Sequence, residues 1–332
     1  MVWVSACVSG AGAINVDYKT RTVEIEGITL KEGDFISLNG TTGEVYKGKV
    51  ETKAAEVSGD FAALMDLCNK YTKLNVRTNA DTPHDAEVAR AFGASGIGLC
   101  RTEHMFFDAE KIVAMREMIL SPDVEGRRKA LAKLLPFQKA DFKGIFKAMD
   151  GCPVNVRLLD PPLHEFVPHD AKGQEEMAKA MGVTVQEIKK RVESLCEHNP
   201  MLGHRGCRLG NTYPEITEMQ TQAILGAAIE LKKEGYDPHP EIMVPLTGIL
   251  YEFEAQEKVI RDAAAALFEK EGMEIPFKVG TMIEIPRAAL TANRIASRAE
   301  YFSFGTNDLT QMTFGYSRDD IASFLPVYLE KK

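Results

Sequence analysis

The chain has 332 residues, of which 45% are hydrophobic, and it carries a net charge of -8 with an isoelectric point near 5.5. This length allows one large domain and one small domain, and the hydrophobic content excludes a disordered or fibrous protein. The acidic balance gives no general reason to expect nucleic-acid binding. No apolar run approaches the roughly 20 residues of a membrane span, and no targeting signal is visible. We therefore predict a protein of the cytoplasm or of an organelle matrix, without nucleic-acid or membrane partners.

Cysteine usage points to the same compartments. The six cysteines are Cys7, Cys68, Cys100, Cys152, Cys196 and Cys207. None of them forms a Cys-x-x-Cys pair, which argues against a structural zinc and predicts reduced thiols. Cys100 and Cys207 lie inside strand-like runs, so we expect them to be buried and inert.

The N-terminal region alternates apolar and polar residues, most clearly from Arg21 to Leu30, and it contains turn sequences at 32–34 and 39–43. This pattern predicts a small β-rich piece over residues 1–56. It offers too few strands for an independent core, which is typical of the end of a larger domain. Residues 57–73 are predicted to form a helical linker.

From Leu74 to Lys332 the chain alternates short apolar runs with helical stretches. We predict seven strands, at 74–78, 96–101, 154–159, 203–209, 241–246, 278–285 and 301–305. Such alternation is typical of an α/β fold with parallel strands, and the length favours a (β/α)8 barrel that lacks its last strand. Two helical insertions, at 109–148 and 174–198, are expected on the loops of this barrel.

Charged residues recur where the predicted strands end. These are Arg77, Arg101, Arg157, Arg205 or Arg208, Glu284 and Asp308. In a barrel they would share the C-terminal mouth, where guanidinium groups bind phosphate or carboxylate through paired hydrogen bonds. The alternative is that individual arginines pair with acids to close the barrel.

The segment from Lys278 to Thr313 suggests a metal site. It predicts a strand, a helical stretch beginning at Pro286 and a second strand, so that Glu284 and Asp308 would emerge at the same edge of a parallel sheet. Neighbouring strands are close enough for both carboxylates to hold one hard cation. The alternative is that Glu284 pairs with a buried arginine while Asp308 caps a helix.

Six motifs resemble the phosphoenolpyruvate-utilising enzymes, and most closely their pyruvate, phosphate dikinase branch. The motifs occur in order at Arg77–Asp81, Gly96–Phe107, Arg157–Phe166, Asn199–Leu209, Gly280–Ala288 and Phe302–Gln311. The match runs from about residue 8 to the end of the chain. It implies that residues 1–56 are the tail of a swivelling phosphohistidine domain and that residues 74–332 are a truncated barrel that binds phosphoenolpyruvate (PEP) and pyruvate.

The resemblance also implies a chemistry. The dikinases interconvert ATP, pyruvate and phosphate with AMP, PEP and diphosphate. By similarity, Glu284 and Asp308 would bind Mg2+, while Thr306 and Asn307 would contact the substrate. Arg101, Arg157 and Arg205 would surround the phosphoryl group.

The family's phosphohistidine motif and proton-donor cysteine motif do not occur in this sequence. The resemblance therefore implies that nucleotide-binding and swivelling domains of a parent chain, expected to form a homodimer, act as partners. Complete turnover by these residues alone is not expected. Two alternatives remain open: an enzyme of the PEP synthase type, and a non-catalytic fragment that binds PEP or serves assembly.

The segment from Thr82 to Gly93 superficially resembles a phosphohistidine loop. His84 would lie on the first turn of a helix, where a phosphohistidine loop could form. The simpler interpretation is that Thr82 caps this helix and Pro83 opens it.

Overall fold

The computed structural model describes residues 12–25, 27–51, 59–197, 199–318 and 320–331. Contacts within the chain divide it into two compact units, Met1–Lys73 and Leu74–Lys332. Cys7 and the first part of the expected linker lie outside the described residues. Among the described residues, no helix combines the length and the apolar content that crossing a membrane requires.

The first unit is β-rich, as predicted. Its strands β1 (Ile14–Asp17), β2 (Thr22–Ile25) and β3 (Ile28–Lys31) form an antiparallel sheet, and β4 (Ile36–Asn39) pairs with β5 (Glu44–Lys47) as a hairpin. The turns fall at the predicted glycines, because Gly33 and Gly43 adopt positive φ angles of 96° and 77° that suit glycine. Helix α1 (Gly59–Tyr71) follows in the segment that was predicted to be helical.

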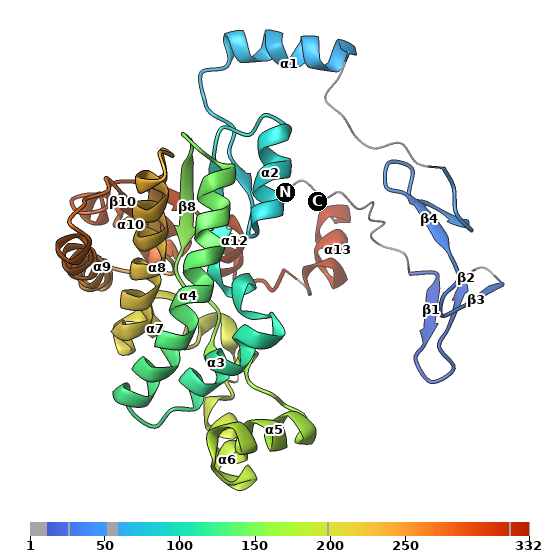
Figure 1. Ribbon diagram of the computed structural model, residues 1–332. Helices are drawn as coiled ribbons and strands as arrows, with labels where there is room; N and C mark the ends of the chain where they lie inside the picture. Colours follow the sequence, from blue (N-terminus) through green and yellow to red (C-terminus); the bar gives the residue numbers. More distant parts are fainter. Residues whose placement is uncertain (1–11, 26, 52–58, 198, 319, 332) are drawn as a thin grey trace. The chain divides into compact units, whose positions relative to one another are not determined.

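The second unit is built on a parallel sheet of six strands, which confirms the predicted α/β class (Figure 1). The strands are β6 (Thr78–Asn79), β7 (Ile97–Arg101), β8 (Pro153–Arg157), β9 (His239–Val244), β10 (Lys278–Ile283) and β11 (Phe302–Phe304). They lie side by side in chain order. Each strand therefore returns through a crossover, and all six carboxyl ends meet at one edge.

Two interactions inside the sheet show that it curls as a barrel does. Arg77 precedes β6 and Glu241 lies on β9, yet Nη1 and Oε2 are 2.6 Å apart. In a flat sheet a separation of three strands would amount to about 14 Å. The hydroxyl of Tyr301, next to β11, likewise donates to Oδ1 of Asn155 on β8 at 2.9 Å. The side chains bridge the concave face, so the sheet has barrel-like curvature.

Helices between the strands cover the sheet and supply its core. They are α2 (Pro83–Ala91), α4 (Val124–Ala148), α8 (Pro214–Lys233), α9 (Leu250–Glu271), α10 (Pro286–Leu290) and α11 (Ala292–Ile295). Fully buried residues such as Phe142 of α4 and Ala227 of α8 share one hydrophobic cluster with Val154 and Ile242 of the strands. After β11 come α12 (Thr306–Phe314), the 3-10 turn η4 (Ile321–Ser323) and α13 (Leu325–Glu330).

A second hydrophobic cluster supports the loops that follow β7 and β8. It involves α3 (Ala109–Leu120), α5 (Ala171–Met181), α6 (Val185–Leu195) and the 3-10 turns η1 (Thr102–Phe106) and η2 (Leu163–Phe166). Buried Met115, Phe166 and Ile188 meet there. Figure 1 shows α5 and α6 packed together beyond α3. The two helical insertions predicted from the sequence are therefore confirmed.

One predicted strand is wrong. Residues 203–209 do not extend the sheet, because they contain the start of α7 (Gly206–Thr212), which follows the 3-10 turn η3 (Pro200–Leu202). Gly206 has a φ of 57°, and its N–H donates to the carbonyl of Asp160 at 2.9 Å. A Cβ at this position would lie 2.7 Å from the Cβ of Leu246. The described part of the sheet thus contains six strands rather than seven.

Candidate functional site

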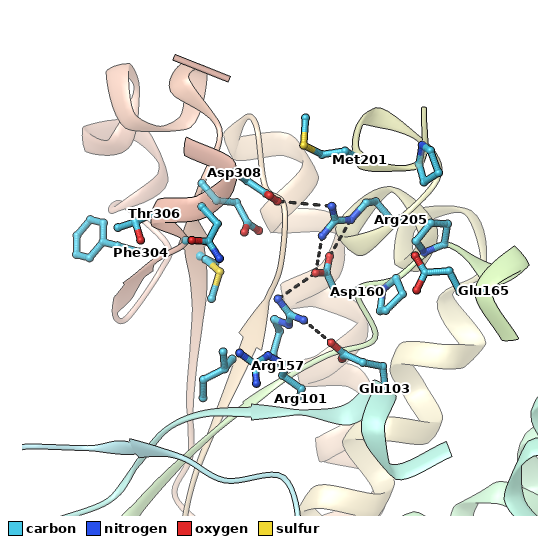
Figure 2. Close-up of a pocket in the computed structure, with 18 residues that line it drawn as sticks. Arg101, Glu103, Arg157, Asp160, Glu165, Met201, Arg205, Phe304, Thr306 and Asp308 are labelled. Atoms are coloured by element: carbon cyan, nitrogen blue, oxygen red, sulfur yellow. Dashed lines mark hydrogen bonds and ion pairs between the residues drawn. The ribbon is translucent and has the colours of Figure 1, made fainter. Parts of the chain in front are cut away.

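A cavity of about 540 Å3 lies at the C-terminal edge of the curled sheet (Figure 2). Residues at the C-terminal ends of β7, β8, β10 and β11 and just after them line it, together with residues around the start of α7. All seven site residues proposed from the sequence belong to this lining: Arg101, Arg157, Arg205, Glu284, Thr306, Asn307 and Asp308. Their convergence follows from the parallel orientation of the strands.

The predicted relation between Glu284 and Asp308 rests on a parallel strand pair that the structure contains. Strands β10 and β11 pair in parallel, and Glu284 directly follows β10. Thr306, Asn307 and Asp308 form the first turn of α12 rather than a free turn. Because the first N–H groups of a helix have no partners within it, this turn presents donors to the cavity.

Three arginines from different elements line the cavity, and two of them, Arg157 and Arg205, share the buried acid Asp160. Arg101 and Arg157 are paired residues of β7 and β8, and Arg205 is the residue before α7. Asp160 accepts from Arg205 Nη2 at 2.6 Å and lies 3.0 Å from Arg157 Nη1, while Glu103 accepts from Arg157 (Figure 2). Burial by itself would lower the pKa of Arg157, but Asp160 and Glu103 raise it. The guanidinium therefore stays charged.

Glu284 is a buried carboxyl group with one oxygen tied to the backbone. The residue is only 3% exposed, and its Oε1 accepts from the N–H of Leu246 at 2.6 Å. Leu246 adopts a φ of 60°, which is uncommon outside glycine. Burial and the negative charges of Asp160 and Asp308 raise the pKa of Glu284 to about 7, against the lowering effects of Leu246 and Arg157.

Asp308 lies 3.5 Å from Arg205, measured between Oδ2 and Nη1. No group of three or more His, Cys, Asp or Glu side chains among the described residues is arranged to hold a metal ion. A cation at this site would therefore take two protein carboxylates and complete its shell with other oxygen atoms, which is how proteins commonly bind Mg2+.

Two arginines named from the sequence lie elsewhere. Arg77 precedes β6, so it stands at the N-terminal end of the strands, where it pairs with Glu241. The prediction failed because the strand begins at Thr78, four residues later than expected. Arg208 donates to the carbonyls of Leu202 and Gly203 and does not line the cavity.

The structure also tests the predictions made for two cysteines and for His84. Cys100 and Cys207 are buried, as predicted, and burial raises the pKa of both thiols, to about 12 for Cys207. His84 lies on α2, where Thr82 caps the helix by accepting from the N–H of Asp85 at 3.1 Å. The simpler interpretation of that segment is therefore correct.

The buried acids Asp160 and Glu103 and the backbone amide of Leu246 were not predicted from the sequence. Both acids stand inside quoted motifs, three residues after Arg157 and two after Arg101. That proximity was the available signal, since a buried arginine requires a partner. No local pattern marked Leu246, because its role depends on a strand-end backbone conformation.

Comparison with known proteins identifies the family. The family model described as PEP-utilising enzyme, PEP-binding domain, matches residues 55–328. The chain is 55% identical to the pyruvate, phosphate dikinase of Clostridium symbiosum, covering 99% of the chain and 38% of that protein. It is 56% identical to the pyruvate, phosphate dikinase of Giardia intestinalis, covering 98% of the chain and 37% of that protein.

A third relative is the chloroplastic pyruvate, phosphate dikinase 1 of Arabidopsis thaliana, at 53% identity over 99% of the chain and 34% of that protein. The chain thus spans little more than a third of the length of these relatives. The matched residues include the whole lining of the cavity at the C-terminal edge. The chain belongs to the family of PEP-utilising enzymes and carries its PEP-binding domain.

Proposed function

We propose that this chain is the PEP- and pyruvate-binding part of a pyruvate, phosphate dikinase. The whole enzyme would interconvert ATP, pyruvate and phosphate with AMP, PEP and diphosphate. The observation that carries this proposal is that one cavity is lined by the seven residues that the family resemblance assigned to the site. The nucleotide-binding domain and the rest of the phosphohistidine domain would belong to other parts of the parent protein, which we expect to be a homodimer.

Three guanidinium groups would bind the phosphoryl and carboxylate oxygens of PEP. Arg157 and Arg205 are held by Asp160, so their orientation is fixed before the ligand arrives. Such preorganised donors stabilise the charge that spreads over a transferring phosphoryl group, because they need no reorientation during the reaction. The N–H groups at the start of α12, together with Thr306 and Asn307, would add donors from the opposite side of the cavity.

Glu284 and Asp308 are the residues that would hold Mg2+. Their fit rests on charge, because Glu284 is buried near Asp160 and Asp308 and its pKa is raised to about 7 by burial and these neighbours. A cation would offset this clustering of negative charge. When bound, Mg2+ supplies positive charge beside the oxygen atoms of the substrate. The Leu246 N–H fixes one oxygen of Glu284 and leaves the other for the cation.

None of the described cysteines lines the cavity. Cys100 and Cys207 are buried with raised pKa values. This supports the view that the domain binds and orients PEP and pyruvate, while the phosphoryl donor and the proton donor come from elsewhere in the parent enzyme.

Isothermal titration calorimetry of the purified chain with PEP in the presence of Mg2+ tests this proposal. We expect binding at one site, and we expect Arg157→Ala to weaken it by roughly a hundredfold, because two charge-assisted hydrogen bonds are lost. Arg128→Ala is the matched control, since Arg128 forms an exposed pair with Glu218 outside the cavity. Circular dichroism would establish that both variants fold. Equal affinity of the wild type and Arg157→Ala would refute the assignment.

A further inference from the structure

We propose that Asp81 is a positioning residue that keeps the guanidinium group of Arg101 turned toward the cavity. Arg101 has no share in the Asp160 arrangement that holds Arg157 and Arg205, so another group must orient it. The identity of the anion that Arg101 would bind rests on the proposed function. The positioning itself rests on contacts in the second unit.

Asp81 contacts Arg101 at two points. Its Oδ1 accepts from the backbone N–H of Arg101 at 2.7 Å, and its Oδ2 lies 3.5 Å from Arg101 Nη1. Asp81 can do this because it follows β6, which pairs in parallel with β7, the strand that ends at Arg101. The Asp81 side chain is 14% exposed, so its charge is poorly screened by solvent.

His104 completes the arrangement. Its Nδ1 lies 2.8 Å from Oδ2 of Asp81, and a carboxylate can only accept, so Nδ1 carries the hydrogen. Oδ2 therefore faces both His104 and the guanidinium of Arg101, while Oδ1 holds the Arg101 backbone. The Asp81 carboxylate is thereby fixed in one orientation.

The neighbouring arginine explains why a positioning group is required. Arg101 and Arg157 occupy directly paired positions on adjacent strands. Like charges in paired positions repel each other, and Arg157 is held in place by Glu103 and Asp160. Without the negative charge of Asp81, Arg101 would be the member free to swing away from Arg157 and out of the cavity. Asp81 offsets this repulsion.

The test compares Asp81→Asn with Asp262→Asn. The first variant removes the charge but retains an oxygen that can accept from the Arg101 N–H. The second removes an exposed carboxylate that pairs with Lys258 on the surface. We expect Asp81→Asn to weaken PEP binding about tenfold by calorimetry, because Arg101 loses its fixed orientation. Asp262→Asn should leave the affinity unchanged.

A double-mutant cycle separates positioning from a general structural effect. If Asp81 acts through Arg101, then Asp81→Asn added to Arg101→Ala should weaken PEP binding no further. Additive losses in the double variant would overturn the inference, as would unchanged affinity in Asp81→Asn when Arg101→Ala binds weakly.

A second measurement does not depend on PEP. Phenylglyoxal labelling followed by peptide mass spectrometry should modify Arg101 several-fold faster in Asp81→Asn, with Arg205 unchanged as the internal reference. Equal labelling of Arg101 in both proteins would overturn the positioning role. Failure of the wild type to bind PEP would instead contradict the proposed function, and labelling would still decide what Asp81 does.

Discussion

The two ends of the curled sheet use the same kinds of residue for different purposes. At the N-terminal end, Arg77 pairs with Glu241, and Tyr301 bonds to Asn155. These polar groups satisfy one another and bridge distant strands. At the C-terminal end, Arg157 and Arg205 instead share Asp160, Arg101 pairs with Asp81, and the buried carboxyl of Glu284 accepts from a backbone amide.

On the proposed function, this difference separates a structural interaction from a binding site. A matched pair leaves little capacity for a ligand, because each charge already has its partner. At the C-terminal end, burial and the nearby charges of Asp160 and Asp308 raise the pKa of Glu284, and the buried Nε of Arg157 has no hydrogen-bond partner among the described residues. A cation would offset the negative charge around Glu284, and an anion would accept hydrogen bonds from the arginines. Mg2+ and PEP together would supply both.

The largest effect is expected when one buried glutamate at each end of the sheet is replaced by glutamine and the two variants are compared. Glu284→Gln should remove the Mg2+ dependence of PEP binding and weaken binding by roughly a hundredfold, because one of two charged metal ligands is lost. Glu241→Gln should retain the Mg2+ dependence. Calorimetry with and without EDTA would measure both. If Glu241→Gln lost the Mg2+ response and Glu284→Gln kept it, the two ends would have been assigned the wrong roles.

A second prediction concerns stability at the N-terminal end. Arg77→Ala should lower the free energy of unfolding by about 2 kcal/mol, because it leaves Glu241 buried without its partner. The value is reduced from that of a fully buried pair, since the Arg77 side chain is 33% exposed. Urea denaturation would measure the loss. PEP affinity should not change. A large loss of affinity would contradict the purely structural role assigned to the N-terminal end.

Two glycines offer a finer contrast. A Cβ on Gly305 would lie 2.5 Å from Oε2 of Glu284, so Gly305→Ala should displace that carboxylate and weaken Mg2+-dependent PEP binding about tenfold. On Gly280 a Cβ would meet Tyr301 instead, 2.5 Å from its carbonyl oxygen. Gly280→Ala should therefore lower the melting temperature. Should Gly305→Ala bind PEP like the wild type, Glu284 would not be the group that needs this space.

The smallest effect concerns thiol reactivity. The raised pKa of Cys207, about 12, means that its thiolate forms only as the pH approaches that value. At pH 8.5 iodoacetamide should therefore label exposed Cys68 and Cys196 but leave Cys207 and Cys100 unmodified until the protein unfolds. Peptide mass spectrometry would distinguish the sites. Rapid labelling of native Cys207 would show that the C-terminal edge is more open than described.

Much of the site could be predicted because it depends on strand ends in a parallel sheet. Glu284 follows β10 and Thr306 begins the helix after β11, so their meeting required only the order of the elements and the direction of the strands. The motifs supplied the selection of Arg101, Arg157 and Arg205. Apolar runs and helical periodicity likewise sufficed for the α/β class.

What failed depended on exact boundaries and on distant contacts. Leu74 and Val76 look like part of a buried strand, yet both side chains are exposed and the strand starts at Thr78, which moved Arg77 to the other end of the sheet. Gly206 is the first residue of a helix, and its N–H donates to the carbonyl of Asp160, a contact that no local pattern contains.

The most direct test of the central claim is a crystal structure of the chain with PEP and Mn2+ in place of Mg2+. An anomalous difference map is expected to show Mn2+ between the carboxylates of Glu284 and Asp308. The phosphoryl group of PEP is expected to contact Arg101, Arg157 and Arg205. Mn2+ or PEP bound instead beside Arg77 at the N-terminal end, with the C-terminal cavity empty, would contradict the account.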